Sequence, residues 1–131
     1  MTRDGPFWLV ALSVASGASL GALLRWGLSY VLNPLSGWMP LGTFAANVTG
    51  GFLIGLAIGW TAAVPDMSPA LRLFLITGFM GGLTTFSTLS AEAFSLMAAG
   101  SAGLGLLLLI AHAAAGLTAT WAGWMLYRLL F

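Results

Sequence analysis

The sequence contains very little charge. Of its 131 residues only four are Lys or Arg and three are Asp or Glu, whereas 60% are hydrophobic. In an ordinary soluble domain about a quarter of the residues are charged, because water has to wet the surface. So few charges cannot cover a globular domain with polar groups. The sequence therefore predicts an integral membrane protein whose outer surface contacts lipid.

Cysteine is absent, and histidine occurs once, as His112. Disulfides, thiolate metal sites and clusters of several histidines within one chain are therefore excluded. The formal net charge of +1 provides no basic surface for nucleic acid. No nucleophile is accompanied by a base and an orienting acid, so we do not expect an enzyme. We interpret His112, which follows an apolar run, as a packing residue.

Four long hydrophobic runs dominate what is present. A helix needs about 20 apolar residues to cross a bilayer. The runs cover about residues 7–31, 41–64, 70–98 and 102–130, with short Pro-, Gly-, Ser- and Asp-rich segments between them. These runs predict an all-α integral membrane protein with four transmembrane helices in a single membrane domain, residues 1–131.

The orientation of these helices is only weakly specified. Four spans put both termini and the 64–69 loop on one side, where Arg3, Arg72 and Arg128 lie, whereas Arg25 lies toward the other side. The positive-inside rule then slightly favours cytoplasmic termini. Such a weak bias fits a chain that inserts in both orientations, and it equally fits any chain with so little charge.

Small residues recur every four positions and end at polar residues. Gly17 and Gly21 lead to Arg25, and Asn47 precedes a row of glycines in the second run. Such rows are typical of close helix packing in membranes. A polar residue inside an apolar run indicates function by default. Structural explanations remain open, since Arg25 can extend to the interface and Asn47 can join helices through hydrogen bonds.

The third run contains the most informative segment, residues 77–90. Three glycines within five positions precede a run of Thr and Ser, which favours an interrupted helix with a break near residues 78–84. Irregular backbone survives in a bilayer only where protein buries it or water reaches it, and its free carbonyls can coordinate a cation. Beyond the break, Thr85, Thr88 and Glu92 share one face of a helix.

The groups gathered here suit a small anion. Hydroxyl and amide groups can donate hydrogen bonds to an anion, and an aromatic ring presents its positive edge. Binding without a fixed charge is weak enough to permit conduction. The composition does not identify the anion.

Three motifs resemble the Fluc/CrcB fluoride channel family, and the resemblance extends over all four helices. They are Gly21-Ala22-x-x-Arg25, then Gly42-Thr43 with Asn47 and the glycines at 50, 51 and 55, and finally Gly78-x-x-Gly81-Gly82-x-Thr84-Thr85-Phe86-Ser87-Thr88. The resemblance implies an antiparallel, dual-topology homodimer in the cell inner membrane. Its two pores would export fluoride passively and relieve fluoride toxicity. The broken third helices would cross around a structural Na⁺.

The resemblance also implies roles for particular residues. The fluoride pore would be lined by Asn47, Phe86, Ser87, Thr88 and the residue at position 89. Here that residue is Leu89 instead of the family's usual second Phe, so one ring-edge contact is missing. Further roles are implied for Arg25 in the vestibule, for Glu92 along the pore exit, and for the backbone carbonyls of Gly81 and Thr84 as Na⁺ ligands.

Two other functions are compatible with the size of the chain. Small four-helix multidrug exporters depend on a membrane-embedded Glu in the first helix, where this sequence has only Arg25. A non-transporting assembly subunit would use the small-residue rows for packing alone, and it leaves the Thr- and Ser-rich segment without a purpose.

Overall fold

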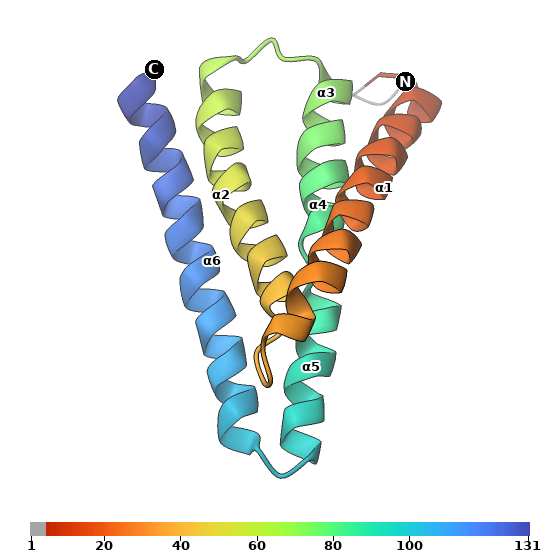
Figure 1. The fold of residues 1–131 in the computed structure, drawn as a ribbon. Helices are drawn as coiled ribbons and strands as arrows, with labels where there is room; N and C mark the ends of the chain where they lie inside the picture. Colours follow the sequence, from red (N-terminus) through yellow and green to blue (C-terminus); the bar gives the residue numbers. More distant parts are fainter. Residues whose placement is uncertain (1–4) are drawn as a thin grey trace.

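The computed structural model describes residues 5–131, so Arg3 lies outside the described residues (Figure 1). The described chain is helical. Its elements are α1 (Phe7–Leu32), η1 (Asn33–Leu35), α2 (Leu41–Ala63), α3 (Pro69–Leu73), η2 (Phe74–Met80), α4 (Gly81–Leu83), α5 (Phe86–Ala98) and α6 (Ala102–Leu130).

Four stretches of the chain are long and apolar enough to cross a membrane. They are Phe7–Leu35, Leu41–Ala63, Pro69–Ala98 and Ala102–Leu130. The prediction of an all-α chain with four such helices is therefore confirmed. The third stretch combines α3, η2, α4 and α5. Its η2 segment has π-helical turns, and Thr84 and Thr85 adopt extended conformations between α4 and α5.

The ends of the four stretches gather at two opposite ends of the molecule. The start of α1, the α2–α3 loop and the end of α6 lie at the top in Figure 1, and the other two connections lie at the bottom.

Particular residues shape the two connections at the bottom. The α5–α6 turn needs Gly100, whose φ of 85° is left-handed. At the α1–α2 connection, the Asn33 side chain accepts a 2.7 Å hydrogen bond from the Gly42 amide, which has no partner within its own helix.

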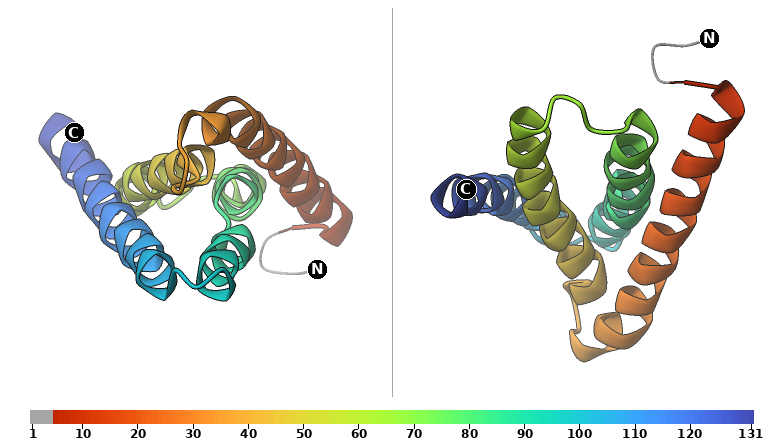
Figure 2. Two further views of the ribbon diagram at one scale, coloured as in Figure 1. Left: turned by 60° about the horizontal axis from the view of Figure 1, so that its bottom comes forward. Right: turned by 90° about the horizontal axis from the view of Figure 1, so that it is seen from above.

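Two seams of small residues hold the helices together. In the first, α1 lies against η2 and α4 (Figure 2). A Cβ atom added at Gly21 would collide with the Phe79 carbonyl oxygen, and one added at Gly82 would collide with the Ala18 carbonyl oxygen. The glycines near the predicted break therefore permit close packing, while the extended residues are the two threonines that follow.

The second seam joins α2 to α6, which run side by side in the same direction (Figure 1). A Cβ atom at Gly51 would lie 2.9 Å from the Gly116 carbonyl oxygen, and one at Gly55 or Gly123 would also meet backbone of the facing helix. Since lipid gives apolar helices no hydrophobic reason to associate, such close backbone approach is what stabilises their packing.

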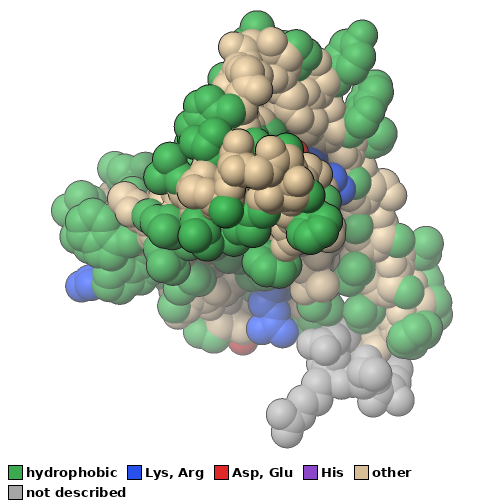
Figure 3. All heavy atoms as spheres, turned by 90° about the horizontal axis from the view of Figure 1, so that it is seen from below, with side chains coloured by type: hydrophobic (Ala, Val, Ile, Leu, Met, Phe, Trp, Pro, Cys, Tyr) green, Lys and Arg blue, Asp and Glu red, His purple; other side chains and the backbone are tan. Residues whose placement is uncertain are grey.

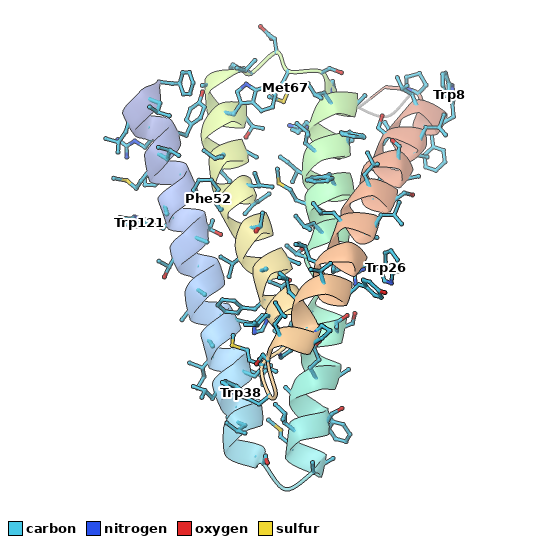
Figure 4. The ribbon with its side chains drawn as sticks, viewed as in Figure 1. Trp8, Trp26, Trp38, Phe52, Met67 and Trp121 are labelled. Atoms are coloured by element: carbon cyan, nitrogen blue, oxygen red, sulfur yellow. The ribbon has the colours of Figure 1, made fainter. Side chains whose placement is uncertain are left out.

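Large apolar side chains cover the outside of the molecule. Trp8, Trp26 and Trp121 point away from the bundle and are at least 60% exposed (Figure 4). The face seen in Figure 3 likewise carries many hydrophobic side chains and few charged ones. Large exposed apolar surfaces belong in contact with lipid or another protein. The polar groups described next lie between the helices.

Candidate functional site

A groove of about 530 Å³ lies between α2, the middle of the third stretch and α6. We call it the central groove. Its polar lining residues are Asn47, Thr84, Thr85, His112 and Thr120. Glycines and apolar side chains form the rest, including Gly81, Phe86 and Leu89. None of its lining residues carries a carboxylate, an ammonium or a guanidinium group, so it offers hydrogen bonds without a fixed charge.

Asn47 of α2 holds the extended backbone that separates α4 from α5. Its Oδ1 atom accepts a 2.7 Å hydrogen bond from the Thr85 amide, and its Nδ2 atom donates a 3.2 Å hydrogen bond to the Thr85 carbonyl. Unpaired backbone groups are very costly in a bilayer. Asn47 thus replaces the helical hydrogen bonds that Thr85 lacks, and it keeps one amide hydrogen for another acceptor.

The start of α5 gathers three hydroxyl groups. Thr85 caps this helix, since its Oγ1 atom accepts a 3.2 Å hydrogen bond from the Thr88 amide. The same atom donates to Thr88 Oγ1 at 3.1 Å and lies 3.3 Å from Ser87 Oγ. The three residues therefore form a connected polar patch at the edge of the central groove.

Two backbone carbonyls lose the donors that a continuous helix would supply. In an α-helix, each carbonyl accepts from the amide four residues later. The amide of Thr85, which would bond the Gly81 carbonyl, donates to Asn47, and the amide of Thr88, which would bond the Thr84 carbonyl, donates to the Thr85 side chain. The carbonyl oxygens of Gly81 and Thr84 therefore lack the donors that a continuous α-helix would give them.

Arg25 lies at the end of the first glycine seam. Its Nε atom donates a 3.1 Å hydrogen bond to the Gly82 carbonyl. A cation near the C-terminal end of a helical segment is electrostatically favourable. Arg25 therefore supports the last turn before the extended residues.

A second cavity, of about 460 Å³, lies between the α1–α2 connection and α5. Thr88 and Glu92 line it, together with residues such as Ser36 and Ser95. One carboxylate oxygen of Glu92 accepts a 2.7 Å hydrogen bond from Thr43, which is fully buried. Its other oxygen is buried without a partner within residues 5–131. The first turns of α5 thus contribute the polar groups of Thr88 and Glu92 to this cavity, whereas the N-cap Thr85 contributes to the central groove.

The residues at positions 86 and 89 have opposite environments. Phe86 is 79% exposed and lines the central groove. Leu89 lines the same groove but is only 7% exposed, because it packs with Ala93 and Leu108. Of these two positions, Phe86 therefore faces outward and Leu89 fills an apolar cluster.

Sequence reasoning did not identify Thr43 as the partner of Glu92, and it did not foresee the bond between Asn47 and the Thr85 backbone. It also treated His112 as packing only, although this residue lines the central groove. The spacing of Thr43 and Asn47, one helical turn apart on α2, was the available signal that both face the third stretch.

The four apolar helices and the polar groove between them define the class, a multi-pass α-helical membrane protein. The chain belongs to the family of CrcB-like proteins (Camphor Resistance, CrcB), whose sequence model matches residues 12–124.

Similar proteins in bacteria share about half of the sequence. The chain is 50% identical over 113 residues to a protein of Aromatoleum aromaticum, with 86% of each chain covered. It is 48% identical over 126 residues to a protein of Cupriavidus pinatubonensis, covering 96% of this chain and 98% of the relative. It is 51% identical over 120 residues to a protein of Thiobacillus denitrificans, covering 92% and 95%. Each relative is named fluoride-specific ion channel FluC.

Proposed function

We propose that this protein is a fluoride channel that lets the anion leave the cell passively and so relieves fluoride toxicity. The observation that carries the proposal is the central groove, which gathers an amide, several hydroxyls and one imidazole but no carboxylate, ammonium or guanidinium group. Neutral donors can replace the hydration of a small anion without trapping it. The names of the bacterial relatives agree with this function, which is transport and not catalysis. A multi-pass helical protein of a bacterium lies in the inner membrane.

The pore lining is part of this proposal. Asn47 donates its remaining amide hydrogen to the anion, Phe86 offers the edge of its exposed ring, and Ser87 and Thr88 continue the polar path. Leu89 supplies an apolar wall where an aromatic residue would supply a second ring edge. The exposure of Phe86 and the hydroxyl bonds around Thr85 support these roles.

Two charged residues lie at the ends of the proposed path. Glu92 lines the second cavity, which would be the pore exit, and Arg25 would make the vestibule more positive. The hydrogen bond from Arg25 to Gly82 adds a structural role to this electrostatic one.

The working unit in this proposal is an antiparallel homodimer whose two chains have opposite orientations in the membrane, with two pores. The central groove is incomplete in one chain, and the Phe86 side chain at its edge is largely exposed. Bilayers do not tolerate polar grooves facing lipid. A second copy would cover the central groove if its broken third helix crossed the third helix of the first copy in the middle of the membrane.

A structural Na⁺ at that crossing fits the chemistry of the available donors. The carbonyl oxygens of Gly81 and Thr84 have lost their helical donors, and both residues line the central groove. Two copies would supply four carbonyl oxygens, the kind of ligand set that broken helices of transporters give to Na⁺. The cation would fix the crossing without taking part in conduction.

Fluoride efflux from reconstituted liposomes tests the function. Vesicles loaded with potassium fluoride should release it through the protein to a fluoride electrode once valinomycin removes the voltage, whereas vesicles loaded with chloride should retain their anion. Equal release of both anions would contradict fluoride selectivity, and release no faster than from protein-free vesicles would contradict the channel itself. Replacing Na⁺ by a large organic cation during purification should lower dimer stability if the cation is structural.

A further inference from the structure

His112 is a buried polar residue for which the proposed function has no role. It is the only histidine of the chain and only 5% exposed, yet it lies on α6 among the residues that line the central groove. Its Nε2 atom is buried and has no hydrogen-bond partner within residues 5–131. Buried polar atoms in proteins nearly always have a partner, so an exception calls for an explanation.

The geometry of the ring fixes which nitrogen carries the proton. Nδ1 lies 3.0 Å from the Leu108 carbonyl oxygen, one helical turn earlier. A carbonyl can only accept, so Nδ1 carries the hydrogen, and in the neutral ring Nε2 carries a lone pair. The Phe44 ring meets the imidazole edge to face, with centroids 5.1 Å apart, and so limits its rotation. Nε2 itself is buried, but His112 lines the central groove, so the groove is the cavity next to the ring from which a partner for Nε2 could come.

We propose that His112 contacts the anion path and that protonation of its ring increases fluoride flux, which makes conduction depend on pH. The proposal rests on the function proposed above. In the neutral ring, the lone pair of Nε2 repels an anion. In the protonated ring, Nε2 becomes a charged donor that attracts one.

Few other ionisable groups are near enough to produce such a dependence. Neither α2 nor the η2 and α4 segments contain an ionisable side chain. On α5 the only one is Glu92, which is bonded to Thr43 and lines the other cavity. On α6 itself, Tyr127 and Arg128 lie four turns further along, and Arg128 stacks over Trp124. Glu92 is therefore the competing candidate that an experiment has to separate.

Fluoride efflux measured at several pH values distinguishes the two residues. In the wild-type protein, the rate after subtraction of protein-free vesicles should rise at least about threefold between about pH 7.5 and about pH 5, a range in which imidazole changes its charge. His112→Gln keeps a neutral donor at this position and should conduct at a rate that is independent of pH. Glu92→Gln is the matched control and should keep the wild-type pH dependence. A flat wild-type profile, or a His112→Gln profile that keeps its slope, would overturn the proposal.

A binding measurement keeps the inference testable if no flux is observed. Because the chain has one histidine, protein labelled with ¹⁵N-histidine and purified without a histidine tag gives a single imidazole signal. Fluoride should raise the midpoint of its titration by stabilising the charged ring, and gluconate should not. An unchanged midpoint would refute the contact between His112 and the anion. Absence of flux in every variant, with a midpoint that does respond to fluoride, would instead refute the proposed channel function alone.

Discussion

At the scale of single residues, Asn47 has two tasks that compete for one amide group. Both of its side-chain heteroatoms bond the Thr85 backbone, and only one N–H remains for an anion. The same residue thus stabilises the extended segment and faces the groove. This overlap explains why sequence reasoning left two interpretations of Asn47 open, since a hydrogen-bond anchor and a pore donor require the same group.

Replacing Asn47 by Asp should separate these tasks. The carboxylate still accepts from the Thr85 amide, but it faces the Thr85 carbonyl without a donor and adds a negative charge to the anion path. Repulsion between that charge and a nearby anion amounts to about 3 kcal/mol, so we expect fluoride efflux to fall roughly a hundredfold. Efflux at the wild-type rate would refute the assignment of Asn47 to the pore.

The matched variant Asn47→Ala identifies the cause of that loss. It removes both bonds to Thr85 without adding a charge, so it should keep more flux than Asn47→Asp while lowering the thermal stability of the protein. Equal flux in the two variants would mean that the anchor alone matters.

At the scale of elements, the sequence predicted what local patterns control. Long apolar runs indicate membrane-crossing helices, and small residues four apart indicate close packing; α1, α2 and α6 have both features. Which residues become extended depends on a hydrogen bond between Asn47 and Thr85, 38 positions apart in the chain. No local pattern encodes that partner. The glycine-rich segment therefore located the irregular region but not the two extended residues within it.

The seam between α1 and α4 should be sensitive to a single methyl group. Gly21→Ala places a Cβ atom against the Phe79 carbonyl and 2.7 Å from the Leu83 amide nitrogen, backbone that cannot move without shifting the helix. Overpacking of this kind costs about 1–3 kcal/mol. The fraction of protein that stays soluble and monodisperse after heating in detergent should fall at a lower temperature than in the wild type.

Gly27→Ala provides the control within the same helix. Its Cβ atom would meet nothing within 4 Å in the described chain, and alanine favours helix more than glycine does. The variant should be at least as stable as the wild type. If both variants melted at the same temperature, the seam would not be the tight contact described here.

At the scale of the whole molecule, charge barely specifies an orientation. Among the described residues, Arg72 lies in α3 and Arg128 near the end of α6, both at the end of the molecule that holds the α2–α3 loop, whereas Arg25 lies in the second half of α1. Arg25 is also engaged with Gly82 in the interior. The positive-inside rule counts charges near the ends of spans, so its net preference is small here. The sequence could indicate this small orientation preference, because the positions of the arginines are visible in it. It could not indicate whether a second copy packs in the opposite orientation, because that depends on contacts between two chains.

Labelling of single cysteines tests the dual orientation. The chain has no native cysteine, so Ser68→Cys and Ser101→Cys each introduce one thiol without changing any charge. These positions lie at opposite ends of the molecule, in the α2–α3 loop and the α5–α6 turn (Figure 1). If the chain inserts both ways, a membrane-impermeant maleimide added to sealed inner-membrane vesicles should label about half of each variant. A permeant maleimide should label all of it.

Complete labelling of one variant with none of the other would establish a single orientation and would exclude the antiparallel dimer. Because the central groove is open in one chain, that result would also require a parallel partner to close the pore.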